Sequence, residues 1–276
     1  MWRGGGRARG AGRRAGRGGG PARGPARAGA SGEYAAVSAA LQGAPRADGA
    51  SPSGAPGPLE AAAGSPGGCC VVALVSHFGD LTPWEYAQEL RARALPALEE
   101  GGVELVLAGL GSAKAAALFA EQTGFPPGRC YALPSGGLYR ELGFSRGFAP
   151  ELEGVSPYLK LLPMLAGAGS PGTLREVLRG YVGDRDAPEV FPGGGVFDVL
   201  GTGYQRPFEL ASRRLLNMAS ILPRWGSLAP EEASLLTFQG GTFVFRGGET
   251  AFAHRDSGIL KRASVDAVLT AALERP

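Results

Sequence analysis

Three cysteines and two histidines are the side chains of this chain that could supply a nucleophile, a redox centre or a metal ligand. Cys69 and Cys70 are adjacent, Cys130 stands apart, and no CxxC spacing occurs. A sparse, odd number of cysteines argues against a disulfide scaffold and fits a reducing compartment. All three are weak redox candidates, and burial as small apolar side chains is the favoured alternative.

The two histidines are also weak candidates for a catalytic or metal-binding role. His77 precedes a loop containing Asp80 and could form an acid/base pair with it, although a structural role is favoured. His254 is expected to be solvated. The sequence predicts no metal, because it has no cluster with metal-ligand spacing. It also predicts no cofactor, because Pro163 interrupts the strand that would have to precede the glycine-rich residues 167–172 in a dinucleotide site.

A strand, a loop and a helix surround His77. Residues 69–76 form an unbroken apolar run typical of a strand buried on both faces. Thr82 is then expected to cap a helix whose first residue is Pro83. The loop at this helix N-terminus would present N–H donors and the positive end of the helix dipole at an accessible edge.

The downstream pattern completes an α/β domain. A helix over 83–100, kinked at Pro96, leads to a strand at 103–108, and together with the first strand they predict a right-handed parallel βαβ unit. Further helices are expected at 112–122, with Ser112 as its cap, and at 137–142, 173–181, 208–222 and 263–273. Further strands are expected at 130–134, 236–238, 242–245 and 250–254. Thr173 and Glu176 fit a capping box. The helix at 208–222 is amphipathic, with Phe208, Ala211, Leu215 and Leu222 on its apolar side and Arg213 and Arg214 on its polar side. This order predicts a thioredoxin-like fold, a central mixed sheet flanked by helices, with a helical and irregular insert at 144–235 before the C-terminal hairpin.

Residues 1–67 differ in composition from the rest. They are mostly Gly, Ala, Pro, Arg and Ser, with one weak helical patch at 33–41, and we expect them to be disordered. Residues 1–32 hold eight arginines and no acid. Removing these leaves 20 basic against 25 acidic residues, so residues 33–276, which include the domain expected at 68–276, are acidic. The basic segment is typical of an organellar transit peptide, and an RNA-binding tail is the less favoured reading. We predict neither DNA binding nor a transmembrane segment, since the longest apolar run, near 159–168, is too short.

Several short segments resemble the peroxiredoxin-like branch of the thioredoxin superfamily, the alkyl hydroperoxide reductase/thiol-specific antioxidant type. The resemblance spans roughly residues 71–273 and is carried by Phe78-Gly79, Thr123-Gly124-Phe125-Pro126, Leu138-Tyr139-Arg140-Glu141-Leu142-Gly143, Gly169-Ser170-Pro171-Gly172-Thr173, Leu178-Arg179-Gly180-Tyr181 and Gln239-Gly240-Gly241-Thr242-Phe243-Val244. The last set looks most like plant and algal chloroplast members. The resemblance therefore implies a chloroplast stromal protein, with the mitochondrion as the alternative.

The resemblance also implies thiol chemistry that this chain lacks at the expected place. Active members carry one or two cysteines just after the first strand, where this chain has Asp80-Leu81-Thr82-Pro83. A carboxylate does not reduce a peroxide, so a pseudoenzyme is expected. We predict a non-catalytic or redox-related accessory protein that binds a protein partner or small ligand at the 78–85 loop, through His77, Phe78, Gly79, Asp80, Thr82, Pro83 and Trp84. The alternative is an antioxidant oxidoreductase that uses Cys69, Cys70 or Cys130.

Overall fold

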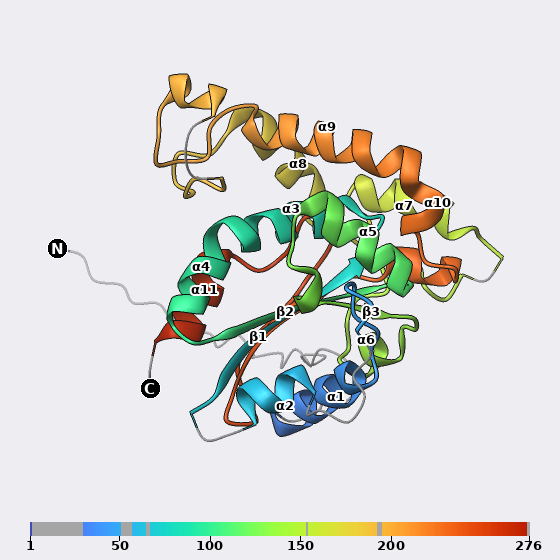
Figure 1. Cartoon of the computed structure of the whole chain (residues 1–276). Coiled ribbons are helices and arrows are strands. Elements are labelled where there is room, and N and C mark those ends of the chain that lie inside the picture. The colour runs from blue at the N-terminus through green and yellow to red at the C-terminus, as the bar shows by residue number, and fades with distance from the viewer. Residues whose placement is uncertain (2–29, 51–56, 65–66, 153, 192–194, 275–276) are drawn as a thin grey trace.

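The computed structural model describes residues 1, 30–50, 57–64, 67–152, 154–191 and 195–274. Its centre is a five-stranded mixed sheet in the order β3-β2-β1-β4-β5 (Figure 1). Strands β1 (Cys69–His77), β2 (Glu104–Leu110) and β3 (Cys130–Leu133) are parallel, β4 (Gly241–Arg246) is antiparallel to β1, and β5 (Glu249–Arg255) is antiparallel to β4. The predicted thioredoxin-like fold is confirmed.

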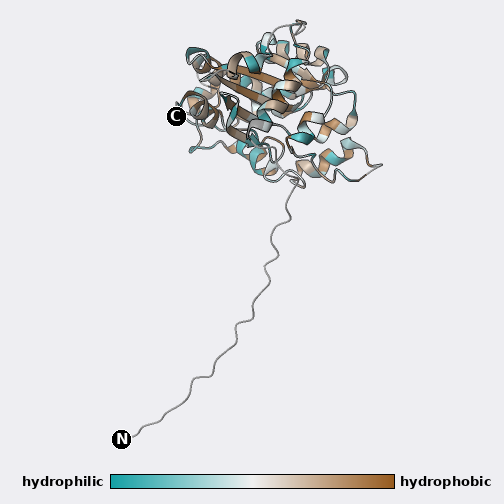
Figure 2. Ribbon diagram, turned by 90° about the horizontal axis from the view of Figure 1, so that it is seen from below, coloured by the Kyte–Doolittle hydropathy of each residue, from teal (hydrophilic) through white to brown (hydrophobic). Residues whose placement is uncertain are grey.

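The central strand β1 is buried on both faces, as its unbroken apolar sequence predicted. Val71, Ala73 and Val75 point into one apolar cluster, and Val72 and Leu74 point into another. Figure 2 shows the apolar strands in the middle of the domain. The two cores lie on opposite sides of the sheet because successive side chains of a strand alternate.

Helices α3 (Leu81–Glu89), α5 (Ala113–Thr123) and α11 (Val265–Leu273) contribute to the first core. Ser112 caps α5 as predicted, with its Oγ accepting from the Ala115 N–H at 3.2 Å. The helix expected at 83–100 is divided: a π-helical turn (Leu90–Ala94) separates α3 from α4 (Leu95–Glu100). Pro96 explains the break, because its missing N–H is tolerated in a helical first turn but not in a helix interior.

The second core corrects the expectation that residues 1–67 are disordered throughout. Helices α1 (Ala30–Gln42) and α2 (Pro58–Ala63) pack beneath the sheet with α6 (Gly137–Glu141) (Figure 1). Val37, Leu41 and Leu59 are fully buried there. The average composition of residues 1–67 suggested disorder, but these few apolar residues cover one face of a sheet that would otherwise be exposed to water. Residues 2–29, which hold all eight arginines of the basic segment, lie outside the described residues.

The 144–235 insert contains α7 (Pro157–Leu165), α8 (Thr173–Val182), α9 (Glu209–Ile221) and α10 (Trp225–Leu228). It also contains the 3₁₀ turns η3 (Val196–Leu200) and η4 (Leu222–Arg224), and a further turn, η5 (Ala233–Thr237), begins at its end. The strand predicted at 236–238 is wrong, because this segment closes η5. The capping box at Thr173 is also wrong: Gly172 is the cap residue, and Thr173 Oγ1 donates to the Ser170 carbonyl at 2.8 Å.

Among the described residues, no helix has the length and apolar content required to cross a bilayer.

Helix α9 lies beyond α3, on the side away from the sheet, and α8 lies beside it (Figure 1). The helix was predicted, but the side expected to face the core faces outward. Leu210, Asn217 and Ile221 are buried, whereas Leu215 and Leu222 of the expected apolar side are exposed. Packing therefore overrides the periodicity, and α9 presents leucines to the outside.

Candidate functional site

The junction between β1 and α3 is closed by Asp80. Its Oδ1 accepts from the Thr82 N–H at 3.3 Å, and Ser76 Oγ donates to its Oδ2 at 2.6 Å. Asp80, not the predicted Thr82, is thus the N-cap, and Thr82 Oγ1 instead accepts from the Leu260 N–H at 3.2 Å. A carboxylate suits this position because it meets free N–H groups and the positive end of the helix dipole.

Most residues of the predicted binding loop are covered. His77, Phe78, Gly79, Thr82, Pro83 and Trp84 are buried, and Asp80 is half-buried. Trp84 Nε1 donates to the Phe78 carbonyl at 2.7 Å, which holds the indole inside the core. On the other side, a Cβ added at Gly79 would lie 3.2 Å from the Trp225 ring. A partner that docked on residues 78–85 would have to displace this cover.

The two histidines lie in different surroundings. His77 packs edge-on against Trp225, with ring centroids 5.8 Å apart, and its Nδ1 has no hydrogen-bond partner among the described residues. Burial lowers its pKa, against the attraction of Asp80, so His77 is a neutral core side chain. His254 is half-buried, with Nε2 2.9 Å from the Lys261 carbonyl, and not simply solvated as expected.

A very small cavity lies beside Asp80. Its wall includes Tyr86, Gly240, Asp256 and Arg262, and its volume of about 10 Å³ matches a single water molecule. Gly240 is required here, because a Cβ would collide with the Leu74 carbonyl. The place where relatives keep a reactive thiol therefore has a carboxylate and no room for an organic substrate.

Asp256 is the most perturbed carboxyl group at this place. Burial raises its pKa to about 8, Arg262 opposes the rise, and the charge of Asp80 adds to it. Its Oδ1 has no hydrogen-bond partner among the described residues, and the nearest cationic candidate is His254 Nε2 at 3.5 Å. At neutral pH Asp256 consequently holds a proton beside the cap of α3.

All three cysteines are far from this junction, and Cys130 is also far from Cys69 and Cys70. All are free and buried. Cys69 and Cys70 begin β1, at the opposite end from Asp80, and their side chains enter different cores. Cys130 pairs in register with Leu107, and Leu107 with Ala73. Its Cα is thus two strands and at least three residues away from either, more than about 13 Å, which exceeds the reach of a disulfide.

Burial also raises the pKa of all three thiols, to about 12 for Cys130. A reactive thiol needs the opposite shift, since the thiolate is the nucleophile. The predicted redox candidates therefore lie in surroundings that suppress thiolate formation. The alternative prediction, an oxidoreductase with relocated cysteines, would need a disulfide partner for Cys130, and neither Cys69 nor Cys70 lies within reach of it.

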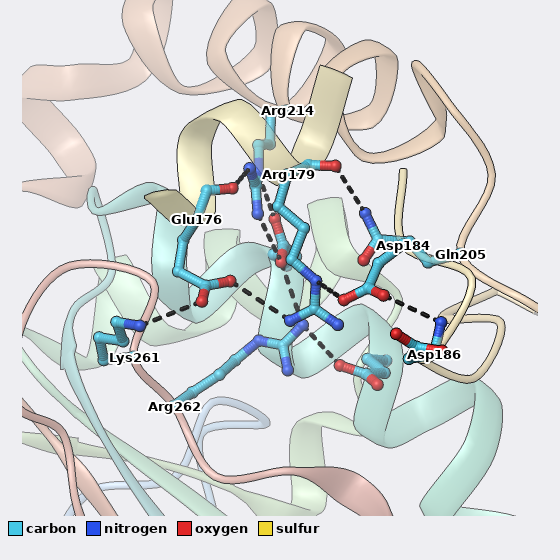
Figure 3. A network of polar contacts seen from close by, with 10 residues as sticks. Glu176, Arg179, Asp184, Asp186, Gln205, Arg214, Lys261 and Arg262 are labelled. Carbon is cyan, nitrogen blue, oxygen red and sulfur yellow. Dashed lines mark hydrogen bonds and ion pairs between the residues drawn. The ribbon is translucent and has the colours of Figure 1, made fainter. Parts of the chain in front are cut away.

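A larger cleft of about 320 Å³ opens on the other side of Arg262. It lies between α3, the insert helices and the segment 254–266. Figure 3 shows the polar network along its wall. Its charged lining residues are Glu85, Glu89, Arg93, Glu176, Arg179, Arg214, Lys261, Arg262 and Asp266.

Buried carboxylates anchor this network. Glu85 accepts from Arg214 Nε at 2.7 Å and from Arg262 Nη2 at 3.0 Å, and Arg262 Nη2 is also 2.6 Å from Glu89. Burial alone would raise the pKa of Glu85, but Arg262 and Arg214 outweigh it and hold the pKa below its ordinary value. Farther out, Lys261 Nζ contacts Glu176 at 3.0 Å, and Arg179 contacts Asp184 at 2.8 Å (Figure 3).

Sequence reasoning missed Asp256, Arg262 and Glu85 as members of one site. A glutamate in an amphipathic helical pattern is ordinarily expected on the solvent side, so nothing marks Glu85 as a buried residue. No local signal joins it to Arg262, 177 residues later. The one available hint was the concentration of charge in His254-Arg255-Asp256 and Lys261-Arg262, immediately after the last strand.

The sheet order and the strand–loop–helix junction define a member of the thioredoxin superfamily whose first helix is capped by a carboxylate. More specifically, the chain belongs to the family of AhpC/TSA antioxidant enzymes, whose sequence profile matches residues 89–258. No curated protein and no solved structure matches the chain. The family match confirms the predicted peroxiredoxin-like relationship. The match begins at the last residue of α3, after Asp80, so it rests on the part of the domain that follows the altered loop.

Proposed function

We propose that this chain is a non-catalytic member of the AhpC/TSA family, a binding or redox-related accessory protein. The observation that carries the proposal is the hydrogen-bonded carboxylate of Asp80 at the N-terminus of α3, beside a cavity of about 10 Å³. Thiol-dependent reduction moves one peroxide oxygen onto sulfur, which becomes a sulfenic acid while the other oxygen leaves as an alcohol or water. A carboxylate has no equivalent oxidation step.

The charged cleft supports a ligand-binding role. At about 320 Å³ the cleft reaches the lower end of the range for small-molecule sites. Its wall combines five basic with four acidic side chains, so the ligand class that fits is a small polar molecule carrying charged groups. Arg262 borders both this cleft and the cavity beside Asp80, which links the proposed ligand site to the junction.

The test is a peroxide-consumption assay on the full chain with a dithiol reductant or a thioredoxin. We expect no thiol-dependent turnover, and no difference among the wild type, Cys69→Ser, Cys70→Ser and Cys130→Ser, since none of these thiols is exposed. Turnover that Cys69→Ser or Cys130→Ser abolishes would overturn the proposal in favour of an oxidoreductase with relocated cysteines. A commercial thiol peroxidase serves as the positive control that calibrates the assay.

The proposed location is the chloroplast stroma, with the mitochondrion as the alternative. The support is the arginine-rich, acid-free composition of residues 1–32. In an import assay with isolated organelles, deletion of residues 1–29 is expected to prevent uptake and leave the folded domain intact, since that deletion ends before α1. Equal uptake of both chains would refute the transit peptide. A loss of salt-sensitive RNA binding on the same deletion would support the RNA-binding reading instead.

A further inference from the structure

Helices of the insert expose apolar faces to the outside. On α9, Leu215 and Leu216 are 72% and 69% exposed, and Leu222 directly after it is 62% exposed, while Ile221 and Asn217 are buried. Apart from Met1 and Leu273, every large apolar side chain that is exposed among the described residues lies between residues 152 and 222. Exposed apolar area on this scale usually marks a contact surface.

The same reversal occurs on the two neighbouring helices. In α7, Lys160 and Met164 are buried, whereas Leu159, Leu162 and Leu165 are exposed. In α8, Thr173 and Gly180 are buried. We use the term outer leucine surface for the exposed apolar side chains of the three helices and of the residue that follows α9: Tyr158, Leu159, Leu162, Leu165, Leu174, Leu178, Tyr181, Val182, Leu215, Leu216 and Leu222. Figure 1 shows α7, α8 and α9 together in the upper part of the domain, and α8 contacts both others.

Charge around this surface is mostly basic. Between residues 157 and 225, five of the six acidic side chains pair with a basic one, and Asp186 is the exception within the described residues. Four arginines of the same region have no carboxylate partner there: Arg175, Arg185, Arg213 and Arg224. The segment 157–225 therefore carries a net positive charge, with eight basic against six acidic side chains, whereas residues 33–276 taken together are acidic.

We propose that the outer leucine surface seats the protein on an anionic lipid bilayer. Helices with leucine and tyrosine on one side and arginine at the margins lie in the plane of a bilayer interface, with the apolar side chains among the acyl chains. Each arginine near an anionic surface adds attraction. A second copy fits less well, because two-fold self-association places the same patch, with its unpaired arginines, against itself.

The decisive measurement uses a fluorescent dye attached to the outer leucine surface itself. The three native cysteines are buried, so a thiol-reactive, polarity-sensitive dye labels a Leu216→Cys variant selectively. Ala39→Cys, exposed on α1 at the opposite side of the sheet, is the matched control. With vesicles of phosphatidylcholine and phosphatidylglycerol we expect a blue shift of the dye at residue 216, none at residue 39, and none with phosphatidylcholine alone.

Vesicle co-sedimentation of the full chain gives the second readout. Leu215→Ser combined with Leu216→Ser is expected to reduce binding at least about tenfold, because two exposed leucines would no longer enter the lipid. Both proteins keep residues 1–32, so any attraction of that basic segment is the same in each, and the exposed sites leave the fold unchanged. Binding that the double variant retains in full, with no shift at residue 216, would overturn the proposal. So would a dimer that forms without lipid and dissociates in the double variant, since the occupant would then be a second copy.

Discussion

Replacement of Arg262 by methionine is expected to lower the free energy of unfolding by about 3 kcal/mol. Arg262 neutralises Glu85 and Glu89, whose side chains are each only 4% exposed. Methionine would preserve most of the side-chain volume but leave two buried carboxylates with one cation fewer. The effect stays at the lower end of the range for a buried pair broken on one side, because Arg214 still contacts Glu85 and Arg93 still contacts Glu89.

Urea unfolding at neutral pH measures this change, and Arg224→Met is the matched control. Arg224 has no carboxylate partner among the described residues, so its replacement should change stability by less than about 0.5 kcal/mol. Combining Arg262→Met with Glu89→Gln should recover part of the loss, because the second change removes one uncompensated charge. A midpoint for Arg262→Met equal to that of the control would show that the cluster does not stabilise the domain.

This cluster also explains why the altered junction is closed. Arg262 joins α3 to the segment after β5, and Arg214 joins α3 to α9. These two contacts hold the insert and the C-terminal segment over the N-terminal half of α3. Arg262 also lines the cavity beside Asp80, so the stability of the cluster bears on the proposed loss of catalysis.

The sequence predicted the parts of the fold that depend on local pattern. The apolar run of β1, the serine cap of α5 and the hairpin between β4 and β5 all appear where expected. The hairpin turn contains Gly247 and Gly248 at φ of 56° and 84°, values that glycine adopts without strain. Each of these features is determined by neighbours within a few residues, so a single sequence contains the necessary information.

What the sequence could not predict depends on what covers each element. The apolar period of residues 208–222 identified α9 correctly, but Leu215 and Leu222 face outward. Periodicity defines an apolar side of a helix and does not say whether protein, lipid or another chain covers it. Likewise, α1 and α2 lie in a segment whose average composition suggests disorder, yet a few buried residues suffice to fix them on the sheet.

The second large effect concerns pH. Asp256→Asn is expected to remove a loss of stability that the wild type shows as the pH rises from about 4 to about 8. Burial raises the pKa of Asp256 from 3.8 to about 8, so over this interval the native protein keeps a proton that the unfolded chain has released. Stability that depends on this proton is complete below about pH 4 and is lost as the pH rises through about 8. Asparagine stays neutral throughout.

Urea unfolding of both proteins at about pH 5, 7 and 9 tests the expectation. The stability difference should grow with pH in favour of the variant, to on the order of 2–5 kcal/mol at the alkaline end. His77, whose pKa burial lowers, acts in the opposite direction below about pH 6.5, but it is present in both proteins and cancels in the difference. Asp186→Asn, at an exposed aspartate, should follow the wild type.

Parallel pH profiles for the wild type and Asp256→Asn would mean that Asp256 ionises normally and that water reaches the cavity beside Asp80. That result would contradict the closed junction, because a carboxyl group in contact with bulk water keeps its ordinary pKa. A diverging profile would instead place a neutral carboxylic acid next to the cap of α3. Since the proposed loss of peroxide chemistry depends on a closed, thiol-free junction, this pH measurement tests its structural basis independently of any activity assay.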